Sequence, residues 1–175
     1  MRLPLLVTLL LAVGCAHEAP AAARHAAPAT ASKPGREPPP MRGVVDAHNA
    51  VRAKHNLPPM SWSPGAAAVA QAWANQCRWG HNPNNGERGE NIAAYTGDPS
   101  PLQSVALWAG EAKDYDSAHN ACRPGAQCGH YTQLVWAKTT RVGCAMTTCD
   151  FLGAGTTFVV CDYEPPGNYI GERPY

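Results

Sequence analysis

The sequence predicts an α+β domain, because helical patterns and strand patterns occupy different parts of the chain. Helix signals follow residue 42, and two segments rich in strand-favouring residues, 141–148 and 156–163, lie near the end. Gly153 and Gly155 between these segments favour a turn, so we expect an antiparallel hairpin. Helices followed by a hairpin are typical of a layered α+β fold.

Three helices are expected before the hairpin. The first covers residues 44–55, where apolar residues recur at helical spacing. The second begins after Ser63, an N-cap residue that precedes a proline, and the third begins after Ser100, where Ser-Pro-Leu-Gln forms a capping box. In the first helix, the residues expected on one side are Val44, Ala47, His48, Val51 and His55, of which His55 is expected to be solvated. The apolar stripe of the second is Ala66, Val69, Ala70, Trp73 and Cys77, and the expected buried face of the third includes Leu102, Val105, Ala109 and Ala112.

Residues 1–15 are expected to be a signal peptide. Their apolar run is shorter than the ~20 residues that span a bilayer. The small residues before Cys15 resemble a bacterial lipobox, in which the cysteine is lipidated and anchors the protein to a membrane. The alternative is an ordinary cleaved secretory signal. Mass spectrometry of the mature N-terminus separates the two, because a chain that begins beyond Cys15 without lipid excludes the anchor.

Residues 16–41 are rich in alanine and proline and show no hydrophobic period, so they are expected to form a disordered tether. Residues 42–175 then form one domain. The formal net charge of +1 argues against a nucleic-acid partner. Nothing in the sequence predicts an oligomeric state.

Six of the seven cysteines lie within the predicted domain. An even set of cysteines behind an apolar leader indicates disulfides formed outside the reducing cytosol. Six cysteines allow many pairings, and their spacing alone does not select one. The six are Cys77, Cys122, Cys128, Cys144, Cys149 and Cys161.

Four segments carry a family resemblance. They read Asp-Ala-His-Asn at 46–49, Gly-Glu-Asn-Ile-Ala at 89–93, Cys-Gly-His-Tyr-Thr-Gln-Leu-Val-Trp at 128–136 and Cys-Asp-Tyr-Glu-Pro-Pro-Gly-Asn-Tyr at 161–169. From about residue 42 to its end the chain resembles the CAP superfamily. That group joins cysteine-rich secretory proteins, antigen five and the pathogenesis-related proteins of the first class, and the plant branch is the most similar.

The resemblance implies an α-β-α sandwich with a central antiparallel sheet between helix layers. It also implies a disulfide pairing, in which one bridge joins facing strands of the hairpin, one closes a polar loop and one ties the second helix to the sheet. The implied pairs are Cys144–Cys161, Cys122–Cys128 and Cys77–Cys149.

The resemblance further identifies four cleft residues, His81, Glu90, Glu111 and His130, with Glu111 in the third helix. Two imidazoles and two carboxylates suit a divalent cation such as zinc, and they also suit proton transfer in a hydrolase. The alternative is a hydrogen-bonded network that only shapes the cleft. Hydrolysis by a serine or cysteine nucleophile is disfavoured, because the sequence shows no Ser–His pairing and the domain cysteines are expected to form disulfides. Hydrolysis by a metal-bound water stays an alternative.

Asp162 differs from the resembled family, in which asparagine is more usual beside that cysteine. A buried aspartate at this position needs a hydrogen-bond partner or a compensating charge.

The first functional hypothesis is a non-enzymatic binding module that requires no cofactor. The resemblance implies a lipid or sterol ligand and a defence or antagonistic role. The alternatives are a metal-dependent hydrolase acting on peptide or envelope material and a structural surface protein. The expected location is extracellular or at the cell surface, anchored to a bacterial membrane through lipidated Cys15 or otherwise secreted.

Overall fold

The computed structural model describes residues 35–97 and 99–175. The predicted signal peptide, Cys15 and most of the predicted tether lie outside the described residues. The described residues belong to one compact unit. Within the described ranges, no helix has the length and apolar character needed to cross a membrane.

The elements follow the predicted order. The helices are α1 (Val44–Ala53), α2 (Pro64–Ala74), α3 (Pro101–Gly110) and α4 (Gly129–Leu134), with short 3-10 turns η1 (Pro39–Met41) and η2 (Glu111–Asp114). The strands are β1 (Ser61–Trp62), β2 (Gly89–Thr96), β3 (Tyr115–Asp116), β4 (Ala121–Cys122), β5 (Arg141–Cys149) and β6 (Thr156–Glu164).

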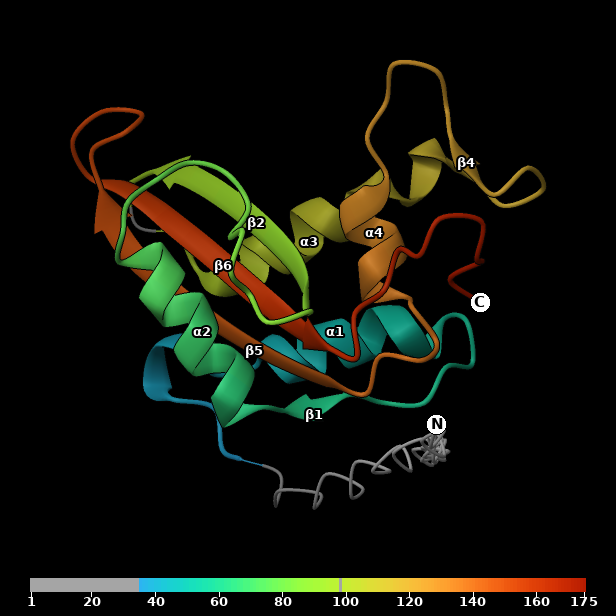
Figure 1. Cartoon of the computed structure of the whole chain (residues 1–175), viewed down its shortest axis with the longest axis horizontal. Coiled ribbons are helices and arrows are strands. Elements are labelled where there is room, and N and C mark those ends of the chain that lie inside the picture. The colour runs from blue at the N-terminus through green and yellow to red at the C-terminus, as the bar shows by residue number, and fades with distance from the viewer. Residues whose placement is uncertain (1–34, 98) are drawn as a thin grey trace, which may run out of the picture. The chain divides into compact units, whose positions relative to one another are not determined.

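The main sheet has the strand order β1-β5-β6-β2, and α2 covers one of its faces while α1, α3 and α4 lie on the other (Figure 1). The α-β-α sandwich is therefore confirmed. The expected hairpin of β5 and β6 is also confirmed, and β2 pairs antiparallel with β6. One detail differs from a purely antiparallel sheet, because β1 adds to β5 in parallel.

Small residues allow α2 to lie close to the sheet. The helix starts at Ser63, whose hydroxyl accepts a hydrogen bond from the Ala66 amide at 3.1 Å. Its inner face is mostly alanine, and Gly143 of β5 faces it. A Cβ atom at Gly143 would lie 2.1 Å from the Ala67 nitrogen, so only glycine permits this approach.

The last residues of the predicted tether belong to the domain. Met41 is buried, and the Glu37 carboxylate accepts hydrogen bonds from the backbone amides of Gly43 at 2.7 Å and Val45 at 2.6 Å. The first amides of a helix have no partner within the helix and carry partial positive charge, so a carboxylate stabilises them. The disordered tether expected up to residue 41 is thus wrong for residues 35–41.

The capping box of α3 is confirmed, but the buried face of the helix differs from the prediction. Leu102 is 39% exposed, and the buried positions are Ser104, Val105 and Trp108. The Trp108 ring enters the core, where its Nε1 donates to the Ile92 carbonyl at 3.2 Å. Burial of this large ring determines which side of α3 faces the core. The spacing of the smaller apolar residues did not predict that side.

Candidate functional site

His81 and Glu90 form the first half of the candidate cleft. His81 lies in the loop between α2 and β2, and Glu90 is the second residue of β2. The His81 Nδ1 lies 2.7 Å from Glu90 Oε1, and the Asn82 amide donates to the same oxygen at 2.9 Å. The hydrogen bond to Glu90 raises the pKa of His81 above its ordinary value, although partial burial opposes the shift.

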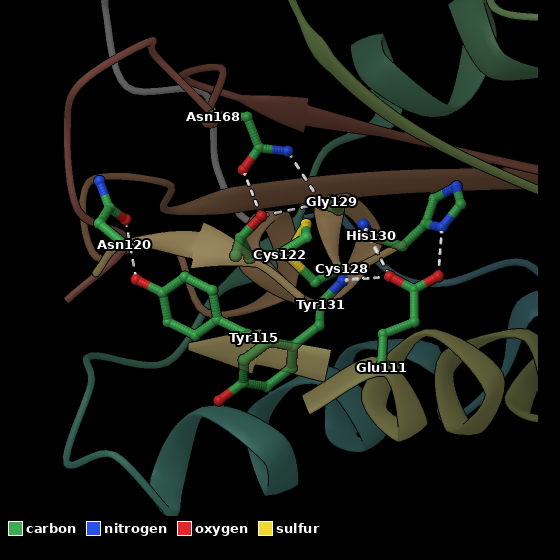
Figure 2. Close-up of a disulfide and its surroundings, with 10 residues drawn as sticks. Glu111, Tyr115, Asn120, Cys122, Cys128, Gly129, His130, Tyr131 and Asn168 are labelled. Carbon is green, nitrogen blue, oxygen red and sulfur yellow. Dashed lines mark hydrogen bonds and ion pairs between the residues drawn. A yellow bond between two sulfur atoms is a disulfide. The ribbon is translucent and has the colours of Figure 1, made fainter. Parts of the chain in front are cut away.

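His130 and Glu111 form the second half (Figure 2). The His130 Nδ1 lies 2.6 Å from Glu111 Oε1, and the backbone amides of His130 and Tyr131 donate to Glu111 Oε2 at 3.0 and 3.2 Å. Burial raises the pKa of the Glu111 carboxyl, but the hydrogen bonds from His130 and from these amides outweigh it and hold the pKa below its ordinary value. Glu111 begins η2 directly after α3, so its expected position inside the third helix is wrong by one residue.

Three of the four residues line one cavity of about 350 Å³, and Glu111 holds His130 from outside the cavity lining. The disulfide Cys122–Cys128 forms part of the cavity wall. Figure 2 shows this disulfide beside His130. The other lining residues come from the start of β2, the loop before α4 and the C-terminal segment. The full lining is His81, Glu90, Asn91, Cys122, Ala126, Gln127, Cys128, Gly129, His130 and Asn168.

The four side chains do not form one ligand set. Within residues 35–97 and 99–175, no three or more histidine, cysteine, aspartate or glutamate side chains are placed to hold a metal ion together. Instead, each carboxylate bonds to one imidazole. An ionised carboxylate only accepts hydrogen bonds, so each imidazole donates through Nδ1–H and keeps the Nε2 lone pair for another partner.

The three disulfides join the pairs that the resemblance implies. Cys77–Cys149 spans 72 residues of sequence and Cys122–Cys128 spans 6. Cys144–Cys161 joins residues that are register partners on β5 and β6.

Two features that bear on binding were not predicted from the sequence. Asp162 is fully buried and lies opposite Glu90 across β2 and β6. A second cavity of about 500 Å³ lies between α1 and α3. Its lining is apolar except for Lys54, and it consists of Ala47, Ala50, Val51, Lys54, Leu102, Val105, Ala106, Ala109 and Gly110.

The fold and cleft define a class of protein: a disulfide-linked α-β-α sandwich in which two carboxylate-bound histidines line one cavity. The model of the cysteine-rich secretory protein family, CAP, matches residues 45–163. The chain therefore belongs to this family of secreted, extracellular proteins.

Human peptidase inhibitor 16 is 45% identical over 145 residues, which cover 77% of this chain and 31% of that protein. This chain thus spans less than a third of that relative. The pathogenesis-related protein PR-1 type of Sambucus nigra is 43% identical over 136 residues, covering 75% of this chain and 79% of the relative. Among solved structures, NaASP2 with Zn²⁺ matches with a TM-score of 0.64 and 25% identity, covering 75% of this chain and 82% of that one.

Proposed function

We propose that this protein is a non-enzymatic extracellular binding module whose cleft holds a divalent cation such as zinc between His81 and His130. The observation that carries the proposal is that both imidazoles are bound at Nδ1 by a carboxylate, at 2.7 Å and 2.6 Å.

Such carboxylate–histidine pairs are typical of metal ligands. The carboxylate fixes the tautomer and orientation of the ring and makes its other nitrogen more basic. Imidazole nitrogen is a preferred ligand of zinc. With two protein ligands, water or an external ligand completes the coordination, so the site is an accessible one. NaASP2, a relative in fold, was crystallised with Zn²⁺, which is consistent with a zinc-binding cleft in this protein.

Zinc binding measured by calorimetry tests the proposal. We expect wild-type protein to bind zinc at neutral pH, His130→Gln to abolish binding, and Glu111→Gln to weaken it about 10–100-fold because the imidazole loses its orienting partner. His119→Gln is the matched control, since its side chain is 81% exposed and pairs with Asp116. Binding that is unaffected by His130→Gln, or no zinc uptake at all, contradicts the metal site.

Zinc affinity is also expected to depend on pH. A protonated imidazole cannot bind metal, so affinity falls as the pH falls through the pKa of each histidine. Because the pKa of His81 is raised, we expect the loss to begin above pH ~6.5, the pKa of an unperturbed histidine. Calorimetry from pH 8 to pH 5 measures this, and a constant affinity over that range would exclude histidine ligands.

The contacts of the cleft do not favour a nucleophilic hydrolase. All six domain cysteines are in disulfides. In the described part of the chain, the imidazoles of His81 and His130 bond to glutamates and neither accepts a hydrogen bond from a serine hydroxyl. A metal-bound water is the remaining route to hydrolysis, and turnover that is lost on chelation and in Glu90→Gln would support it.

The cavity between α1 and α3 favours a second binding function, for an apolar ligand such as a sterol or an acyl chain. Its volume of about 500 Å³ is within the ordinary range of small-molecule sites, and its lining side chains are apolar except for Lys54. We expect Ala50→Arg, which places a charge in this cavity, to reduce retention of a sterol or fatty acid at least tenfold. Ala53→Arg is the control, because Ala53 is an exposed residue of the same helix outside the lining. If both variants retain the sterol or fatty acid equally, this cavity is not the binding site for an apolar ligand.

We propose that the protein acts outside the cell and that any defence or antagonistic role follows from these binding sites. Lipid anchoring through Cys15 stays a prediction that lies outside the described residues. If neither metal nor apolar ligand binds, a structural surface protein is the interpretation that survives.

A further inference from the structure

A pair of carboxyl groups lies inside the sandwich, behind the cleft. Glu90 of β2 and Asp162 of β6 are partners in the antiparallel register of these neighbouring strands (Figure 1). Partners of this kind have Cβ atoms about 4.5–5.5 Å apart on the same face of the sheet. The Asp162 residue is 0% exposed and the Glu90 side chain is 3% exposed, so neither carboxyl is solvated.

Three of the four oxygens in this pair have no hydrogen-bond partner. Glu90 Oε1 accepts from His81 and Asn82, but Glu90 Oε2 and both Asp162 oxygens are buried and unpartnered. Two ionised carboxylates would leave three buried acceptors without a donor, which is costly in free energy. A single proton placed between them makes one O–H···O hydrogen bond and so pairs two of these three oxygens.

Among the described residues, the arginines on and next to these strands are bonded to Glu164. Asp162 faces α2, because its other register partner is Gly143, where a Cβ would touch that helix. The sequence of α2 contains no ionisable residue. Arg88 is the nearby cation, and its guanidinium is bound to Glu164 at 2.7 Å.

The remaining charged groups on these strands do not provide a cation for the Glu90–Asp162 pair. On β5 the ionisable residue is Arg141, which also bonds Glu164, at 3.3 Å. Burial, followed by the negative charge of Glu90, raises the pKa of Asp162 to about 8, with Arg88 opposing and Glu164 adding to the rise.

We propose that Asp162 is protonated in the folded protein at neutral pH and donates its hydroxyl to Glu90 Oε2. Asp162, Glu90 and His81 then form one hydrogen-bonded chain from the sheet to the cleft. Asp162 is a positioning residue: it holds the carboxylate that orients His81. The inference does not depend on whether the cleft binds metal.

This buried proton makes folding stability depend on pH. The folded state keeps the proton between the unfolded pKa of ~3.9 and the raised folded pKa, whereas the unfolded state releases it. The contribution of Asp162 to the free energy of unfolding is therefore largest below pH ~4 and decreases as the pH rises to about 8. Above that value it no longer changes with pH. The pair thus couples extracellular pH to the stability of the strand that carries Glu90.

Asp162→Asn tests the proposal, because a carboxamide has nearly the same shape, donates to Glu90 Oε2 and does not titrate. We expect the unfolding equilibrium constant of the wild type, divided by that of Asp162→Asn, to rise with pH, approaching tenfold per pH unit between about 4 and 8. Urea unfolding at a series of pH values measures this ratio. Asp150→Asn, at an exposed position, is the control and should give a constant ratio.

Infrared spectroscopy of the wild type provides a test that does not require the variant to fold. At pH 6 exposed carboxyls are ionised, so we expect a carbonyl band of a protonated, buried carboxylic acid, which disappears above pH 9. A water molecule bridging two ionised carboxylates would give neither the band nor the pH-dependent ratio. Absence of the band, or parallel stability profiles for wild type and Asp162→Asn, overturns the proposal.

Discussion

Replacing Arg52 by methionine is expected to lower the free energy of unfolding by about 3–5 kcal/mol. Arg52 is 1% exposed, and its guanidinium donates to five backbone carbonyls. Four of these carbonyls lie in residues 134–139, the segment that leads from α4 to β5. Methionine fills a similar volume but leaves the carbonyls without donors, and each buried unpaired group costs about 1–3 kcal/mol before relaxation. Urea denaturation measures the loss.

Arg42→Met is the control for this variant. Arg42 is exposed, so the same change of residue type should alter the free energy of unfolding by no more than about 0.5 kcal/mol. Arg52→Lys keeps the charge but has three donors in place of five, and an intermediate loss is expected. A loss for Arg52→Met as small as that for the control would mean that the guanidinium does not hold this segment.

Removing the Cys77–Cys149 bridge, by changing both residues to alanine, is expected to cost about 4 kcal/mol. The bridge joins the end of α2 to the end of β5 across 72 residues. In the chain-entropy model a cross-link restricts the unfolded chain more when it closes a longer loop. Without the bridge, α2 is held to the sheet by its packed inner face, by the hydrogen bonds at its N-terminus and by those from Gln71 to β5.

The Cys122–Cys128 bridge is the matched comparison. It spans 6 residues, so the same model gives a cost of about 2 kcal/mol when both cysteines become alanine. Thermal and urea unfolding of the two double variants measure the difference. If the two double variants lose equal free energy of unfolding, or if the Cys122–Cys128 variant loses more, the entropy of the unfolded chain does not determine which bridge stabilises the protein more.

Local signals in the sequence predicted much of the fold. The starts of α2 and α3 depend on side chains within three residues of the cap, Ser63 and Ser100, and both were predicted correctly. The hairpin of β5 and β6 was also predicted, because strand-forming residues and intervening glycines are local. By contrast, α4 lies in an apolar segment too short to show a period, and the Glu37 cap acts on amides six and eight residues away.

The cleft could be predicted only through family resemblance. His81 and Glu90 are 9 residues apart, and Glu111 and His130 are 19 apart, so no local motif joins them. The resemblance gave the four residues but not their geometry, in which carboxylates bond imidazoles. The pairing of Asp162 with Glu90 depends on the register of β2 against β6, which a single sequence does not determine.

The central claim is that Glu90 and Glu111 hold His81 and His130 through Nδ1 and leave Nε2 available in the cleft. Long-range ¹H–¹⁵N NMR of the imidazoles, recorded above the pH at which they protonate and with zinc added stepwise, tests this most directly. The account predicts Nδ1–H tautomers for both rings and a zinc-dependent shift at both Nε2 atoms, with His119 unchanged. Nε2–H tautomers, or spectra that zinc does not alter, would contradict it.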